Sequence, residues 1–270
     1  MATRTTEVRA VMELREIEER VLDAVGRAMG RFAMLRPGDR IAVGVSGGKD
    51  SLCLLGALVA YRRRAPFPYE LVAVTVEQGK FKLPITTLEA HIRSLGVPWV
   101  LVEDRTTLRL VADGVVHGCD VCSRHRRSEL YRTASDQGCS VIALGHTADD
   151  CAESLFRNVL FNGRIGSLPP VATSRKGGLR VIRPLVYVAE ETTTAYARAR
   201  GVLTVGCVCG DRENVRREIR QFLTTMKDRH PGVRESIVAA LGNVNPYMLF
   251  DSALEKAGAD RAPAFDGVAD

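Results

Sequence analysis

The stretch that decides the fold reads Arg40-Ile41-Ala42-Val43-Gly44-Val45-Ser46-Gly47-Gly48-Lys49-Asp50-Ser51. Its first half, 40–45, is a short apolar run of the kind that forms a buried strand. Its second half is a glycine-rich turn that opens a helix predicted over 50–64. At such a strand-to-helix turn, backbone N–H groups and the positive end of the helix face any bound anion. The sequence therefore predicts an anion site at 46–51.

The same alternation of strands and helices continues toward the C-terminus. Further apolar runs predict strands at 71–76, 99–102 and 141–144, and an edge strand at 181–185. Helical patterns lie between them at 86–95, 123–137 and 149–160. Nearly unbroken apolar strands that alternate with helices indicate a parallel sheet covered on both faces. We therefore predict an α/β fold with a Rossmann-like parallel sheet.

Helical patterns flank this α/β region on both sides. Residues 7–34 predict a long amphipathic helix, and three basic helical patterns follow at 190–200, 213–228 and 232–241. The tail after 251 is rich in Ala, Gly and Asp, a composition that favours poor order. The predicted organisation is an N-terminal helix over 1–36, an α/β domain over 37–188, a helical C-terminal region over 189–251 and a disordered tail over 252–270.

Composition excludes several classes of protein. The chain has 270 residues, 46% of them hydrophobic, which argues against global disorder. No apolar run approaches the roughly 20 residues of a membrane span, and charged residues such as Glu7 and Arg9 stand where a signal peptide is apolar. We expect a cytoplasmic protein with no membrane partner. The net charge of +6 permits an anionic partner such as nucleic acid without requiring one.

The loop itself differs from the two best-known phosphate loops. Val43 and Asp50 occupy positions where a Walker A loop has Gly and Ser or Thr, and the glycine spacing does not fit the dinucleotide fingerprint. Two glycines still let the backbone approach a phosphate closely, while Lys49 adds a positive charge and the serines add hydroxyl donors. The alternative interpretation is a tight turn whose polarity is incidental.

The sequence Ser46-Gly-Gly-Lys-Asp-Ser51 resembles the pyrophosphatase loop (PP-loop) of N-type ATP pyrophosphatases. Those enzymes cleave ATP between the α and β phosphates and activate a carbonyl oxygen as an adenylate, from which a nucleophile displaces AMP. The resemblance implies a catalytic role for Asp50 and a Mg²⁺ ion. It also implies an ATP site made of Ser46, Gly47, Gly48, Lys49, Asp50, Ser51, Val74, Gly145, His146, Asp149 and Asp150.

Asp149 and Asp150 have a second explanation. Paired carboxylates at a helix start could hold Mg²⁺ between phosphates. They could equally stabilise the helix through its dipole.

Seven cysteines, an odd number, favour a reduced protein in which a cysteine cluster indicates metal or redox chemistry. Cys119 and Cys122 form a C-x-x-C before a basic helix, and Cys207 and Cys209 form a C-x-C far downstream. These four could form a structural zinc site, a redox dithiol or an iron–sulfur cluster with three thiolates. Spacing alone favours zinc. The remaining three are interpreted as small buried hydrophobes: Cys53, Cys139 and Cys151.

The stretch from Cys119 to Ala134 resembles the C-x-x-C region of bacterial tRNA 2-thiocytidine synthetases. Similarity continues at Leu144-Gly-His, Phe161-Asn-Gly, Leu168-Pro-Pro, Ile182-Arg-Pro-Leu185 and Cys209-Gly210. The resemblance implies a [4Fe–4S] cluster bound by Cys119, Cys122 and Cys207, with the fourth iron free to hold a hydrosulfide. Because the family's distal pair is usually C-x-x-C, Cys209 is an alternative third ligand.

The family's activity implies the function of this chain. It would replace the C2 oxygen of an anticodon-loop cytidine in tRNA by sulfur, through an adenylated base. A cysteine desulfurase or another donor would supply the sulfur, and a homodimer is an expected assembly. Arg124, Arg126 and Arg127 would attract RNA phosphates, or would simply form a solvated helix face. The alternative functions are a related [4Fe–4S] enzyme acting on uridine or a free base, and a non-catalytic nucleotide-binding protein with structural zinc.

Overall fold

The computed structural model describes residues 2–79, 81–114, 119–174, 178–204 and 215–254. At its centre is a six-stranded sheet with the order β3-β2-β1-β4-β6-β5. All neighbouring strands are parallel except β5, which runs antiparallel to β6. The strands are β1 (Arg40–Gly44), β2 (Glu70–Glu77), β3 (Trp99–Glu103), β4 (Val141–Ala143), β5 (Val171–Thr173) and β6 (Arg180–Ile182).

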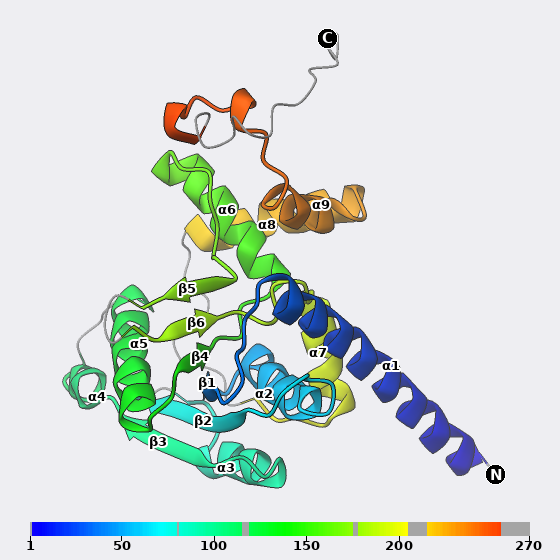
Figure 1. Ribbon diagram of the computed structural model, residues 1–270. Coiled ribbons are helices and arrows are strands. Elements are labelled where there is room, and N and C mark those ends of the chain that lie inside the picture. Colours follow the sequence, from blue (N-terminus) through cyan, green and yellow to red (C-terminus); the bar gives the residue numbers. More distant parts are fainter. Residues whose placement is uncertain (1, 80, 115–118, 175–177, 205–214, 255–270) are drawn as a thin grey trace.

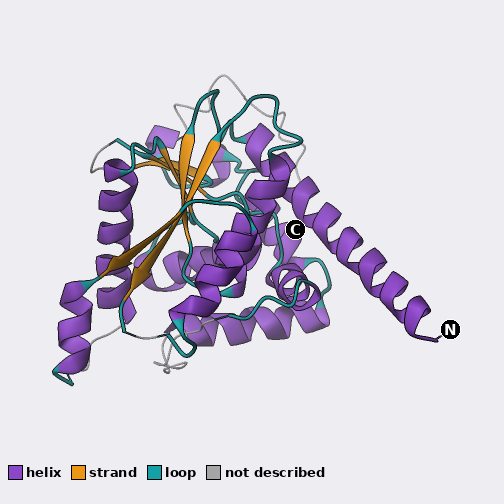
Figure 2. Ribbon diagram, turned by 90° about the horizontal axis from the view of Figure 1, so that it is seen from below, coloured by secondary structure: helices purple, strands orange, loops and turns teal. Residues whose placement is uncertain are grey.

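Helices cover both faces of this sheet, as predicted (Figures 1 and 2). Successive side chains of a strand point to opposite faces, so Ile41 and Val43 join one buried cluster while Ala42 joins another. The first cluster includes residues of α1, α2 and α7, and the second includes Leu130 and Ala134 of α5. The helices are α1 (Ala2–Arg31), α2 (Lys49–Tyr61), α3 (Ile85–Ser94), α4 (Arg105–Ala112), α5 (Cys119–Asp136), α6 (Ala148–Asn162), α7 (Glu190–Ala199), α8 (Val215–Arg229), α9 (Val233–Ala240) and the short 3₁₀ helix Pro246–Met248.

The helices outside the α/β core form two distinct additions. The N-terminal part of α1 extends away from the body of the molecule, whereas α8 and α9 pack on α6 (Figure 1). Among the described helices, none combines the length and the apolar character needed to cross a membrane.

Two features of the sheet differ from the sequence-based expectation. The run at 181–185 was predicted to be an edge strand, but its strand, β6, lies between β4 and β5. The edge on that side is β5, which the sequence analysis missed because it is three residues long and only partly buried. It pairs with β6 as a hairpin, with Val171 opposite Ile182. The helix α4 was also missed.

The start of α5 differs from the prediction in a way that affects the candidate site. The sequence predicted a helix over 123–137 preceded by the C-x-x-C, but the helix begins at Cys119. Its polar first turn has no apolar periodicity that could have predicted it. Other helix ends differ by a few residues, as helix boundaries commonly do. The predicted disordered tail falls mostly on 255–270, outside the described residues.

Candidate active site

The loop between β1 and α2 is a preformed turn. The Val45 N–H donates to the carbonyl of Val74 at 2.8 Å, which anchors the loop to β2. Gly47 has a φ of 76°, in the left-handed region that glycine adopts without strain. The Ser51 hydroxyl donates to the Gly48 carbonyl at 2.8 Å and accepts from the Ser46 N–H at 3.2 Å.

The N-terminus of α2 is open to an anion. Its N-cap residue, Gly48, supplies no side-chain hydrogen bond, so no side chain caps the N–H groups of its first turn. Together with the positive end of the helix dipole, these N–H groups form the kind of site that binds phosphate. The side chain of Val74 is buried in the sheet core, so only its backbone can take part in the site.

Lys49 is balanced by two carboxylates. Its ammonium donates to Glu190 Oε1 at 2.7 Å and to both oxygens of Asp50 at 3.0 Å. Burial alone would lower the pKa of Lys49, but the hydrogen bond to Glu190 and the charge of Asp50 outweigh it and raise the pKa. Asp50 also accepts from the Thr193 hydroxyl. Glu190 and Thr193 come from α7, and no sequence pattern connected them with the loop.

Gly145 brings the turn after β4 against the start of α2. A Cβ at this position would lie 3.1 Å from the carbonyl carbon and oxygen of Asp50 and from the Ser51 nitrogen. Only glycine permits this backbone approach without a shift. The structure therefore brings the second half of the predicted ATP site next to the first.

His146 follows Gly145 and contacts an arginine from the neighbouring strand. Arg183 Nε donates to His146 Nδ1 at 3.2 Å, and Arg183 Nη1 donates to the Pro169 carbonyl at 2.6 Å. Burial, then the charges of Arg183, Arg216, Arg127 and Arg126, lower the pKa of His146 to about 4.

Asp149 and Asp150 both have partners at the start of α6. Asp150 forms a capping box with Thr147 and also pairs with Arg216 at 2.6 Å. Asp149 accepts from the Glu190 N–H at 2.7 Å. Within the described part of the chain, no three side chains of His, Cys, Asp or Glu are grouped to hold a metal ion. The capping box gives Asp150 a structural role at the start of α6, and the Mg²⁺ ion stays a prediction.

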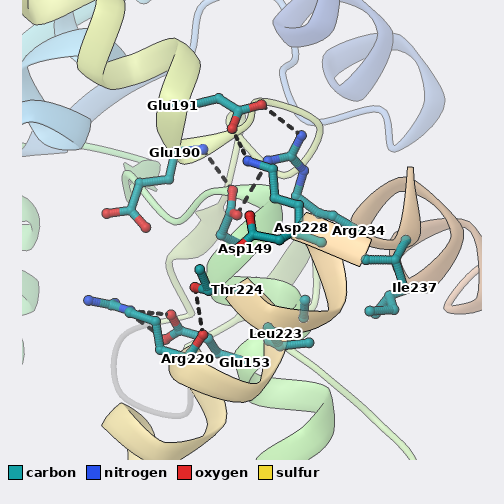
Figure 3. Close-up of a pocket in the computed structure, with 13 residues that line it drawn as sticks. Asp149, Glu153, Glu190, Glu191, Arg220, Leu223, Thr224, Asp228, Arg234 and Ile237 are labelled. Atoms are coloured by element: carbon teal, nitrogen blue, oxygen red, sulfur yellow. Dashed lines mark hydrogen bonds and ion pairs between the residues drawn. The ribbon is translucent and has the colours of Figure 1, made fainter. Parts of the chain in front are cut away.

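Figure 3 shows a cavity beside these residues, enclosed by α6, α7, α8 and α9. Its volume is about 280 Å³, and charges of both signs line it. Glu153 is buried on its wall and accepts from Arg216 at 2.8 Å and from Arg220 at 2.6 Å. The sequence analysis missed Glu153, although it lies one helical turn after Asp149 and Asp150 on α6. These ion pairs attach α8 to the α/β core.

The first turn of α5 carries the C-x-x-C to the same edge of the sheet. Gln78, just after β2, donates from Nε2 to the Cys122 carbonyl at 3.0 Å and to Asp104 Oδ2 at 2.8 Å. Asp104 follows β3 and accepts from the Thr107 N–H at 3.0 Å, which fixes the start of α4. Because the carboxyl ends of parallel strands share one edge, this network lies on the same side of the sheet as the loop after β1.

Of the predicted cluster ligands, Cys119 begins α5 and the side chain of Cys122 is buried in the next turn. Cys207 and Cys209 lie outside the described residues. Cys53, Cys139 and Cys151 are buried, as predicted, and burial raises the pKa of both Cys53 and Cys151 to about 12.

The fold and the loop define a class. A mainly parallel sheet whose first strand ends in an uncapped Ser-Gly-Gly-Lys-Asp-Ser turn is a nucleotide-binding α/β protein with a PP-loop. A model of the PP-loop domain family matches residues 17–225.

Relatives of known activity cover nearly the whole chain. The tRNA-cytidine(32) 2-sulfurtransferase of Anaeromyxobacter dehalogenans is 42% identical over 255 residues, 93% of this chain and 88% of the relative. That of Neisseria meningitidis serogroup C is 40% identical, covering 93% of this chain and 80% of the relative. The chain belongs to the PP-loop domain family and, within it, to the family of these relatives. This confirms the resemblance to bacterial tRNA 2-thiocytidine synthetases.

A solved structure supports the fold. The U34-tRNA thiolase NcsA from Methanococcus maripaludis, determined with its [4Fe–4S] cluster, matches with a TM-score of 0.68 at 22% identity. The match covers 88% of this chain and 81% of that one. At this level of identity the likeness concerns the fold.

Proposed function

We propose that the protein replaces the C2 oxygen of a tRNA anticodon-loop cytidine by sulfur, at the expense of ATP. The observation that carries this proposal is the placement of two motifs at one edge of the sheet. The uncapped loop with Lys49 follows β1, and the C-x-x-C turn of α5 is tied to the end of β2 through Gln78. The names of the relatives, which specify cytidine 32 of tRNA, support the same substrate.

The chemistry of the nucleotide half follows from the loop. Ser46, Gly47, Gly48, Lys49 and Ser51 would hold the pyrophosphate part of ATP. The C2 oxygen of the base would attack the α-phosphorus, and the bond to pyrophosphate would break. The resulting adenylate makes this oxygen a good leaving group, since it departs with AMP when sulfur attacks C2.

The cysteine motif fits an iron–sulfur cluster. Cys119 and Cys122 are three residues apart in one helix, and this spacing is compatible with two ligands of one cluster. When bound, the [4Fe–4S] cluster would supply an iron that can carry the sulfur to be transferred. Its third ligand, Cys207 or Cys209, and its sulfur donor, a cysteine desulfurase or another protein, remain part of the proposal. The homodimer also stays a prediction.

The charge of the surrounding helices suits an RNA substrate. Arg126 and Arg127 of α5, Arg183 after β6 and Arg216 of α8 all act on His146 electrostatically. Positive charge from three parts of the fold therefore converges at the edge where the two motifs lie. Such a surface attracts phosphates of RNA in a salt-dependent way.

The decisive experiment combines genetics with metal analysis. Deletion of the gene should remove 2-thiocytidine from bulk tRNA, and the wild-type gene should restore it. The Cys119→Ala variant should fail to restore it while still binding ATP, whereas Cys139→Ala, at a buried cysteine outside the motif, should restore it. Loss of a uridine-derived thionucleoside instead would establish the related enzyme. Anaerobically purified protein that is colourless and contains zinc would establish the binding protein.

A further inference from the structure

His146 is held by an arginine that can only donate. Arg183 is itself fixed, because its backbone N–H bonds to the Pro170 carbonyl at 2.9 Å and its Nη1 to the Pro169 carbonyl at 2.6 Å. From this anchored position its Nε lies 3.2 Å from His146 Nδ1. A guanidinium has no acceptor atom and stays protonated in proteins. His146 Nδ1 must therefore present its lone pair, and a neutral ring must carry its proton on Nε2.

The surroundings oppose a second proton on this ring. The positive charges that act on it belong to Arg183 after β6, Arg126 and Arg127 of α5 and Arg216 of α8. Both acids at the start of α6 already have partners: Asp150 pairs with Arg216 and forms the capping box, and Asp149 accepts from the Glu190 N–H. Burial and these four positive charges lower the pKa of His146 to about 4. The ring is thus an N–H donor at neutral pH and not a general base.

The position of His146 connects it with the reaction. The preceding residue, Gly145, is in contact distance of the backbone of Asp50 and Ser51 at the start of α2. His146 thus lies beside the phosphate loop, on the edge that the C-x-x-C turn also reaches. A neutral histidine that donates to an oxygen with developing negative charge is an established catalytic device.

We propose that Arg183 is a positioning residue that fixes His146 as an Nε2-protonated neutral imidazole, and that this N–H donates to an oxygen of the α-phosphate of ATP during adenylation. The second part rests on the proposed function, whereas the first does not. Phosphoryl oxygen is the acceptor that suits this position, because the charges that act on the ring are positive and anionic charge builds on the α-phosphate as the base attacks.

Nitrogen NMR of the whole protein tests the first part without any activity measurement. The chain has five histidines, so selective ¹⁵N-histidine labelling and a His146→Gln spectrum assign the ring. We expect the Nε2-protonated pattern for His146 from pH 8 down to pH 5. A ring protonated on Nδ1, or an imidazolium at pH 7, overturns the proposal.

Adenylation kinetics test the second part, measured as tRNA-dependent exchange between pyrophosphate and ATP. His146→Leu should slow the exchange about a hundredfold, the usual effect of removing one such donor, while the Kd for ATP changes less than twofold. His146→Gln retains an N–H donor and should recover at least a tenth of the rate. The control is His91→Gln on α3, which should leave the rate unchanged. Equal rates for His146→Leu and the wild type overturn the catalytic role.

Arg183→Met separates positioning from general folding. Burial, the largest cause of the lowered pKa of His146, persists in this variant, but the charge of Arg183, the second cause, is lost. The pKa of His146 should therefore rise, and the exchange rate should fall in mild acid at a higher pH than in the wild type. Arg183→Lys keeps a positive donor and should restore most of the wild-type profile. An Arg183→Met profile identical to that of the wild type overturns the positioning role. If this variant does not fold, the wild-type NMR spectrum still decides the tautomer.

Discussion

The Lys49 ammonium donates to the Glu190 carboxylate at 2.7 Å, across 141 positions of the sequence. Through this ion pair, a carboxylate of α7 contacts Lys49, the lysine of the phosphate loop. The carboxylate neutralises a charge that the pyrophosphate of ATP would otherwise meet unopposed. Burial would raise the pKa of Glu190, but the hydrogen bond and charge of Lys49, followed by the charges of Arg220 and Arg216 of α8, outweigh it and lower the pKa. ATP binding must therefore exchange one partner of Lys49 for another.

The Glu190→Gln variant should bind ATP more tightly, because the nucleotide no longer breaks an ion pair to reach Lys49. A partly exposed pair is worth up to about 1 kcal/mol, so a roughly fivefold decrease in Kd is expected. Isothermal titration with a non-hydrolysable ATP analogue measures it. The matched control is Glu191→Gln on the same helix, which loses contacts with Lys227 and Arg234 only. Weaker binding by Glu190→Gln would mean that Glu190 contributes to the nucleotide site.

Gly145→Ala should weaken ATP binding and lower stability together. The added methyl would stand 3.1 Å from backbone atoms of Asp50 and Ser51, which cannot rotate away as a side chain can. We expect a loss of about 1–3 kcal/mol in the free energy of unfolding, typical of overpacking, measured by urea denaturation. Gly166→Ala is the control, since an added Cβ there meets nothing within 4 Å. Equal stability and equal Kd in the two variants would contradict the close approach.

How much of this could be predicted from sequence depends on the range of each interaction. The strand pattern and the loop at 46–51 were predictable because periodicity and glycine content are local signals. The edge strand β5 was not, since three residues, two half-buried and one exposed, carry no period. The long-range ion pairs could not be predicted either. Glu190 is 141 residues from Lys49 in the loop, and Arg216 is 63 residues from Glu153. Such pairs are set by how α7 and α8 pack on the sheet.

Gln78→Leu should reduce the iron content of anaerobically purified protein. The amide is the buried link between the Cys122 carbonyl and Asp104, so its loss removes the hydrogen bonds that tie the turn carrying the C-x-x-C to the end of β2. We expect less than half of the wild-type iron per chain, measured by colorimetric assay. Tyr69→Phe is the control, because it removes a buried hydrogen bond to the Leu58 carbonyl away from α5. Full iron content in Gln78→Leu would show that the turn holds without this link.

Cys53 and Cys151 should resist alkylation in the native protein. Burial raises the pKa of both thiols to about 12, so the reactive thiolate is scarce at pH 8, and both side chains are almost fully covered. Iodoacetamide treatment followed by peptide mass spectrometry should find both unmodified after an hour in buffer and modified in urea. Rapid native labelling of Cys151, which lies beside Asp150, would contradict its assignment as a core residue.

The histidine at position 146 should make the protein less stable in mild acid. Its pKa is about 4 in the folded chain and 6.5 when exposed, so between these values the unfolded chain binds more protons than the folded one. By linkage, the free energy of unfolding then falls as the pH is lowered from 6.5 toward 4, by at most roughly 3 kcal/mol. Acids such as Glu190, whose pKa is lowered, lose their contribution only below their ordinary value near 4.5, so the window from pH 6.5 to 5 separates histidines from these acids. Urea denaturation across that window should show a slope in the wild type that His146→Gln largely removes and that His91→Gln changes less. A wild-type slope that persists in His146→Gln would assign the acid sensitivity to another group.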